Sequence, residues 1–268
     1  MRSPRRLSAL RLVLSILVPV GLVAGVVFSV TAEAATTFRR DVAQQPVANT
    51  RVEPTAPAQP VQPVEPADPR VIVTPPAGAG LDIYPAAGAP VPSQGLSAFN
   101  ELGSPLVLLG VQQYGDWIQV LLPTRPNGST GWVRAQDVSR SVPAHRVEIS
   151  LAAHELKVVR MSDDAVLLTT AVGIGRPTTP TPSGQFFVRD HFPTGSMNHP
   201  YGPFAFGLSG HSDVFYQFGT GDGRIAIHGT NQPSSIGADA SNGCPHVAND
   251  IVLALIDYLP LGTPVIIS

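Results

Sequence analysis

The sequence predicts a mainly β protein built from two successive β modules with one or two short helices. Apolar and polar residues alternate at period two in residues 117–121 and 147–151, which is typical of half-buried strands. Pro126-Asn127-Gly128 is a strong hairpin-turn signal between two such segments. Helical spacing of apolar residues occurs near the end of the chain, in residues 249–259.

Residues 1–35 are predicted to direct export. A basic stretch containing Arg5 and Arg6 precedes an uncharged run over residues 12–30, and Ala32-Glu33-Ala34 is a cleavage pattern. The uncharged run is also about as long as a membrane span. The segment is therefore either a cleaved signal peptide or an N-terminal membrane anchor. In both cases the rest of the chain is exported, to the cell wall or the outer face of the cytoplasmic membrane.

Residues 36–69 are interpreted as a Pro-rich linker. From Val42 to Pro69 the chain is dominated by Pro, Ala, Gln and Val and shows no helix or strand period. Linkers of this composition are extended and semi-rigid. The segment is either a spacer that reaches into the wall or a disordered stretch without a function of its own.

Residues 70–141 predict a small all-β barrel. Short strands are expected near residues 71–73, 81–84, 106–111 and 117–121, with a return strand beginning at Gly131. The segment DWIQVLLPTRPNGSTGWV resembles the bacterial SH3-like modules that precede catalytic domains in actinobacterial wall enzymes. That resemblance implies a positioning or wall-contact role. Trp117 and Trp132 are candidates for stacking on sugars, but we favour a place in the barrel core for both.

Residues 145–268 predict the second module. Strands are expected over residues 147–151, 156–160, 166–170, 185–188, 224–227 and 264–267. Asn249 is expected to cap a helix. The apolar face of that helix comprises Ile251, Val252, Leu255, Ile256 and Leu259.

Composition narrows the classes of function. The chain carries 17 Lys and Arg against 19 Asp and Glu, and no basic stripe indicates a nucleic-acid partner. Its single cysteine, Cys244, cannot form an intramolecular disulfide. A free thiol in an exported protein is prone to oxidation, so its presence favours a chemical use over an inert buried cysteine.

Two short motifs carry the predicted chemistry. In Ile227-His228-Gly229-Thr230, a buried strand ends at His228 and fixes its ring on a rigid element. In Ser241-Asn242-Gly243-Cys244, a turn projects the thiol and bares the N–H groups of Gly243 and Cys244 towards an oxyanion. A histidine beside the thiol is expected to lower its pKa and supply the thiolate nucleophile.

A zinc site is the main alternative use of these residues. Candidate ligands are His211, His228, Cys244 and His246. Their spacing matches no compact structural zinc motif, and no HExxH or HxxEH pattern is present. The sequence therefore predicts neither a metal nor another cofactor.

Five segments between residues 175 and 267 occur in an order that resembles the L,D-transpeptidase catalytic domain of peptidoglycan synthesis. They are GRPTTPTPSGQF, YGPFAFGLSG, IHGT, SNGC and LGTPVII. The resemblance implies a β-sandwich fold and a transferase of cell-wall biogenesis and cell shape. Its substrates are peptidoglycan stem peptides as donor and acceptor, and carbapenems are expected inhibitors. The thiol attacks diaminopimelate of a tetrapeptide stem, D-alanine leaves, and an acceptor amine resolves the thioester into a 3→3 cross-link.

The same resemblance assigns roles to individual residues. Cys244 is the nucleophile, His228 the general base and acid, and the carbonyl of Gly229 orients the His228 ring. Gly243 and Cys244 match the oxyanion turn. Candidate substrate-binding residues are Tyr201, Ser241, Asn242 and His246.

The chain departs from the family pattern around its cysteine. The family often reads Ser-His-Gly-Cys-aliphatic-Arg, whereas here Asn242 replaces the His and Pro245-His246 replaces the last pair. Histidine cannot grip a carboxylate as arginine does. Either substrate anchoring has shifted or activity is reduced. Two alternatives therefore stand beside the transpeptidase: an L,D-carboxypeptidase that uses water as acceptor, and a catalytically impaired wall-binding protein.

Overall fold

The computed structural model describes residues 70–219 and 221–268. The predicted export segment and the linker, residues 1–69, lie outside the described residues. Within the described ranges, no helix reaches the length and apolar character that a membrane span requires.

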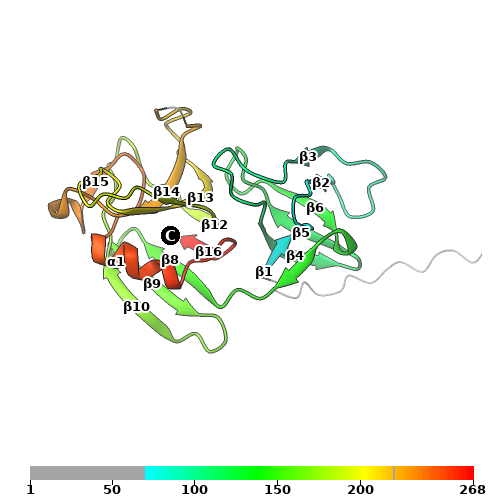
Figure 1. Cartoon of the computed structure of the whole chain (residues 1–268), viewed down its shortest axis with the longest axis horizontal. Coiled ribbons are helices and arrows are strands. Elements are labelled where there is room, and N and C mark those ends of the chain that lie inside the picture. Colours follow the sequence, from blue (N-terminus) through cyan, green and yellow to red (C-terminus); the bar gives the residue numbers. More distant parts are fainter. Residues whose placement is uncertain (1–69, 220) are drawn as a thin grey trace, which may run out of the picture. The chain divides into compact units, whose positions relative to one another are not determined.

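The first sheet has five strands in the order β6-β5-β4-β1-β7, all antiparallel neighbours (Figure 1). Its strands are β1 (Val71–Thr74), β4 (Leu108–Tyr114), β5 (Trp117–Leu121), β6 (Thr130–Arg134) and β7 (Ser139–Ser141). A separate hairpin joins β2 (Leu81–Ile83) to β3 (Gln94–Leu96). A short 3-10 turn, η1 (Ala135–Asp137), precedes β7.

The core of this module is aliphatic. Val73, Leu108 and Val120 are fully buried, as expected of the inward faces of alternating strands. The preferred interpretation of the two tryptophans as core residues is wrong. Trp117 and Trp132 are only half-buried, and the Trp117 ring packs edge-on against Tyr84.

The second sheet has seven strands in the order β10-β9-β8-β16-β12-β13-β14. Only the β8–β16 pair among them is parallel. The strands are β8 (His145–Ser150), β9 (Glu155–Arg160), β10 (Val166–Ala171), β12 (Gly184–Pro193), β13 (Phe204–His211), β14 (Arg224–His228) and β16 (Pro264–Ile267). A parallel pair, β11 (Ile174–Gly175) and β15 (Asp239–Ser241), stands apart from the sheet.

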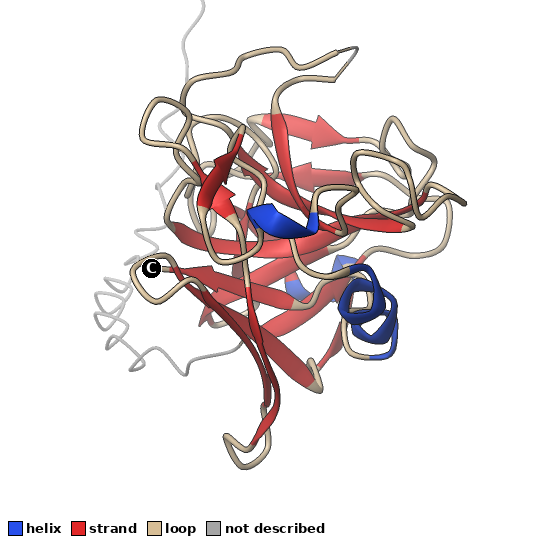
Figure 2. Ribbon diagram, turned by 90° about the vertical axis from the view of Figure 1, so that its left-hand side faces the viewer, coloured by secondary structure: helices blue, strands red, loops and turns tan. Residues whose placement is uncertain are grey.

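One hydrophobic core joins the two ends of this sheet. Val147 on β8 and Leu156 on β9 belong to the same buried cluster as Phe206 on β13 and Ile227 on β14. Strands far apart in the sheet order therefore face each other, and Figure 2 shows the curved strands with the helix at one side. This is a β-sandwich, and the predicted mainly β fold is confirmed for the described residues.

The predicted helix is shorter than expected and is capped differently. α1 spans Asn249–Ala254 and continues as a 3-10 turn, η3 (Leu255–Asp257). The N-cap position falls on Ala248, so the prediction that Asn249 caps the helix is wrong. Asn249 instead accepts a hydrogen bond from the Thr230 N–H at 2.8 Å. Ile256, expected on the buried face, is exposed because the chain has changed to 3-10 geometry there.

Candidate active site

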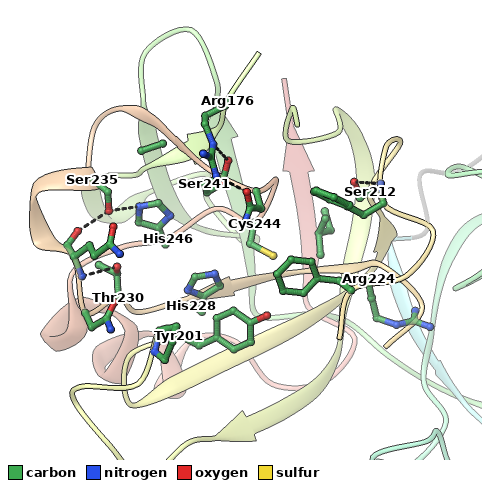
Figure 3. Close-up of a pocket in the computed structure, with 18 of the residues that line it drawn as sticks. Arg176, Tyr201, Ser212, Arg224, His228, Thr230, Ser235, Ser241, Cys244 and His246 are labelled. Atoms are coloured by element: carbon green, nitrogen blue, oxygen red, sulfur yellow. Dashed lines mark hydrogen bonds between the residues drawn. The ribbon is translucent and has the colours of Figure 1, made fainter. Parts of the chain in front are cut away.

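The predicted chemical residues meet in one cleft of the second module. The cleft has a volume of about 540 Å³. Its walls come from Arg176, β14 and the segments 199–201, 212–218, 230–235 and 240–246 (Figure 3). Of the predicted site residues, Tyr201, His228, Ser241, Asn242, Cys244 and His246 line it.

His228 is the last residue of β14 and is buried. Its Nδ1 lies 2.5 Å from the carbonyl oxygen of Gly229, so in the neutral ring Nδ1 donates and Nε2 is an acceptor. Burial lowers the pKa of His228 to about 4, although the Gly229 carbonyl acts in the opposite direction. The imidazole is therefore neutral at pH 7 and able to take up a proton.

Cys244 sits on a turn that is braced from the loop after β11. Gly243 has φ +119°, a backbone conformation that favours glycine. The Thr181 hydroxyl donates to the Gly243 carbonyl at 2.8 Å and accepts from the Gly175 N–H at 2.9 Å. The Ser241 carbonyl accepts from the Thr179 hydroxyl at 3.1 Å. These contacts fix the backbone on which the thiol stands.

The expectation that His228 lowers the thiol pKa is wrong for this structure. Burial raises the pKa of Cys244 to about 11, and the backbone at Ala226 offsets this only in part. Within the described residues, no hydrogen bond joins the Cys244 sulfur to the His228 ring, although both groups line the cleft. The resting pair is therefore a neutral thiol and a neutral imidazole.

Alkylation of Cys244 by iodoacetamide is expected to be slow at pH 7. With a pKa of about 11, roughly one thiol in ten thousand is ionised there. The rate should rise about tenfold per pH unit between pH 7 and 10. Because the chain has a single cysteine, intact-mass spectrometry reports this site alone. A rate that levels off below pH 8 would instead indicate a thiolate–imidazolium pair.

The two predicted oxyanion donors are not equivalent. The Gly243 N–H donates to the Ser241 hydroxyl at 3.0 Å. No acceptor within the described residues takes the Cys244 N–H. Of the predicted donors, the Cys244 N–H is therefore the one that is open to a ligand in this state.

The Tyr201 and His246 rings flank the His228 ring on the cleft wall. The Tyr201 ring centroid lies 4.6 Å from that of His228, and the His246 ring is stacked on His228 at 5.8 Å. The Nε2 atom of His246 lies 2.7 Å from the Ser235 hydroxyl. Burial lowers the pKa of His246, so this ring does not supply the positive charge of the arginine that it replaces.

Sequence reasoning missed Arg176, which contacts the cysteine turn. Its backbone N–H and its Nε both donate to the Ser241 carbonyl, at 3.1 and 3.2 Å. Its Nη2 donates to the Asn242 side-chain oxygen. The only sequence signal for this role was that Arg176 lies inside the GRPTTPTPSG segment. Its contact with Ser241 could not be predicted locally, because 65 residues separate the two.

A second missed residue, Arg125, holds residues 212–215 and Asp222, next to one wall of the cleft. The guanidinium donates to the carbonyls of Ser212, Phe215 and Asp222 at 2.6, 2.8 and 3.1 Å. It also lies over the Tyr216 ring, 4.7 Å from the centroid. Arg125 belongs to the hairpin turn of the first module, so that module contributes directly to the order of the cleft.

The described residues contain no group of three or more His, Cys, Asp or Glu side chains that could hold a metal ion. His211, one of the four candidate zinc ligands, is outside the cleft lining. Its Nε2 instead lies 3.0 Å from the Asp222 carboxylate.

A β-sandwich whose cleft holds a thiol and the neutral imidazole of His228 has the groups that a thiol-dependent acyl-transfer enzyme uses. The chain belongs to the L,D-transpeptidase catalytic domain family of YkuD type. The family model matches residues 144–267. YkuD of Bacillus licheniformis, named as an L,D-transpeptidase, is 31% identical over 158 residues, covering 56% of this chain and 86% of that protein. Membership makes the protein an acyltransferase of the YkuD type.

Solved structures resemble the chain more distantly. Bd1075 of Bdellovibrio bacteriovorus is 24% identical with a TM-score of 0.37, over 47% of this chain and 48% of that one. The chain thus spans about half the length of Bd1075. The L,D-transpeptidase LdtMt1, solved in complex with imipenem, is 16% identical with a TM-score of 0.40, over 74% of this chain and 82% of that one.

Proposed function

We propose that the protein is an exported peptidoglycan L,D-transpeptidase that forms 3→3 cross-links through a thioester on Cys244. One observation carries the proposal. A thiol on a braced turn and a neutral imidazole with an oriented tautomer line the same cleft. This arrangement supplies a nucleophile and a proton acceptor without a metal.

In the first step, the Cys244 sulfur attacks the carbonyl carbon of diaminopimelate in a tetrapeptide donor stem. Nε2 of His228 takes the thiol proton as the carbon–sulfur bond forms. Because the thiol pKa is raised to about 11, this transfer accompanies the attack rather than preceding it. The Cys244 N–H stabilises the oxyanion. The carbon–nitrogen bond then breaks, and D-alanine leaves with the proton from His228.

In the second step, the side-chain amine of an acceptor stem attacks the thioester carbon. His228 accepts a proton from the amine, and the carbon–sulfur bond breaks as the new amide forms. The same proton then returns to the Cys244 sulfur, which restores the neutral pair. The ring alternates between base and acid because Gly229 holds Nδ1–H throughout.

The predicted arrangement of the chain fits this role. Residues 1–35 would export or anchor the protein, and the linker 36–69 would carry residues 70–268 from the membrane towards the wall. In this proposal residues 70–141 position the catalytic module, residues 145–268, against its substrate.

An L,D-carboxypeptidase of the same chemistry is the second candidate. Among the described residues that line the cleft, none is Asp or Glu. The cleft therefore offers the acceptor's ammonium group no anionic partner, a feature that favours water as acceptor. Incubation with tetrapeptide muropeptides separates the two activities by mass. A cross-linked dimer supports the transpeptidase, and a tripeptide alone supports the carboxypeptidase.

The acyl-enzyme itself is tested by incubating the full-length chain with a carbapenem and recording its intact mass. We expect a gain of one carbapenem mass per chain. A folded protein that gains no mass, and that also leaves muropeptides unchanged, would overturn both enzymatic proposals and support the impaired wall-binding protein.

A further inference from the structure

The charge of the cleft lining points to an anionic ligand. The lining residues include two arginines, Arg176 and Arg224. No described lining residue carries a carboxylate. The chain as a whole has a formal net charge of −2, so the cationic character is local to the cleft. A cleft of this kind attracts a negatively charged group and repels a cationic one.

The two arginines differ in what they already bind. The Arg224 Nη2 lies 2.8 Å from the Asp222 carboxylate, and its Nε lies 3.7 Å from Glu101. Figure 3 shows its side chain directed away from Cys244. Arg224 is therefore part of an ion-pair network rather than a free cation of the cleft.

Arg176 has no carboxylate within ion-pair distance among the described residues. Its two neighbours, the Ser241 carbonyl and the Asn242 side-chain oxygen, are neutral. They occupy Nε and one hydrogen of Nη2, which together form one edge of the guanidinium. Among the described residues, no acceptor takes the Nη1 and Nη2 hydrogens of the other edge, and the side chain is exposed. This second edge has the fork geometry that binds a carboxylate through two parallel hydrogen bonds.

The neighbours of Arg176 also hold it in place. Both acceptors belong to the turn that carries Cys244, and Figure 3 shows the guanidinium beside Ser241 on the Cys244 side of the cleft. A side chain restrained in this way loses less conformational freedom on binding than a free surface arginine. The cation is thus preorganised close to the reacting sulfur.

We propose that Arg176 binds the terminal carboxylate of the acyl-donor peptide and so determines specificity for donors that end in a free acid. The inference rests on the proposed function and deepens it. The residue beyond the scissile carbonyl carries this carboxylate, so the group lies within one residue of the carbon that Cys244 attacks. Arg176 thereby supplies the positive charge that His246 lacks.

The test compares two donors, a tetrapeptide stem with a free terminal carboxylate and the same peptide as its terminal amide. For the full-length chain we expect kcat/KM to be about tenfold higher for the acid. In Arg176→Gln this preference should disappear, because kcat/KM should fall about tenfold more for the acid donor than for the amide donor. Arg176→Lys keeps the charge but not the fork, and should retain only part of the preference. Arg160→Gln is the matched control, because Arg160 is an exposed ion-paired arginine outside the cleft lining.

The outcomes separate the inference from the proposed function. If Arg176→Gln reduces turnover of acid and amide equally, the residue only braces the cysteine turn and the inference is wrong. The inference is also wrong if the variant keeps the wild-type preference. If the wild-type chain turns over neither donor and forms no carbapenem adduct, the proposed function itself fails.

Discussion

Replacing Cys244 with alanine is expected to abolish acyl-enzyme formation. The proposed route passes through a bond to the sulfur, and the chain has no second cysteine to take over. Loss of a covalent nucleophile lowers turnover by roughly 10⁴-fold or more, because positioning and oxyanion contacts supply only the residual rate. The measurement is the carbapenem adduct by intact mass, followed by muropeptide turnover.

The loss of adduct can be assigned to the missing sulfur only if Cys244→Ala remains folded. Cys244 is partly buried against the core, and removal of one sulfur atom should cost about 1 kcal/mol. The thermal unfolding midpoint should then fall by only about 4 °C. A Cys244→Ala protein that still carries the adduct would place the nucleophile elsewhere and refute the thioester mechanism.

His228→Gln is expected to reduce the acylation rate by roughly 10²- to 10⁴-fold. The glutamine side chain can contact the Gly229 carbonyl but cannot accept and return a proton. Substrate binding should change less than turnover, because the His228 ring acts on the proton that is transferred during the chemical step. Single-turnover mass spectrometry separates the two, and His145→Gln is the matched control. The His145 ring bonds to the Tyr258 carbonyl outside the cleft.

The same substitution is expected to make the fold less sensitive to acid. Burial lowers the pKa of His228 from 6.5 to about 4, so between these values the unfolded chain binds a proton that the folded chain excludes. Acidification through this window therefore favours unfolding, by up to about 3 kcal/mol from this group. Urea unfolding at pH 7.5 and pH 4.5 should show a smaller loss in His228→Gln than in the wild type. An equal loss in both proteins would contradict the buried neutral ring.

The mainly β fold could be predicted because most strands alternate clearly, but β13 could not. The segment Phe204–His211 contains Gly207 and Gly210, and glycine is depleted in strands. The structure shows why glycine is needed there. A Cβ atom on Gly207 would lie 2.0 Å from the Asp190 carboxylate, and one on Gly210 would lie 2.4 Å from the Phe186 ring. Such close approaches depend on partners distant in sequence, so no local pattern reveals them.

The candidate site likewise has features that the sequence predicted and features that it could not predict. The motifs around His228 and Cys244 predicted which side chains share the cleft, because each motif is local. The neutral resting pair could not be predicted, since both pKa shifts arise from burial by the folded chain. The role of Arg176 was hidden for a similar reason. Its partners Ser241 and Asn242 follow 65 and 66 residues later.

The contacts of Arg125 indicate how far the chain can be shortened without disturbing the cleft. The family match begins at residue 144, yet the carbonyls of Ser212, Phe215 and Asp222 are satisfied by a guanidinium from residue 125. In a chain shortened to residues 144–268, these carbonyl oxygens would lose their hydrogen bonds to Arg125 and would bond to water instead. One wall of the cleft would then be less restrained. The segment that orders the cleft is therefore longer than the segment that carries the family motifs, and a shortened chain meant to keep the cleft has to include the hairpin turn that holds Arg125.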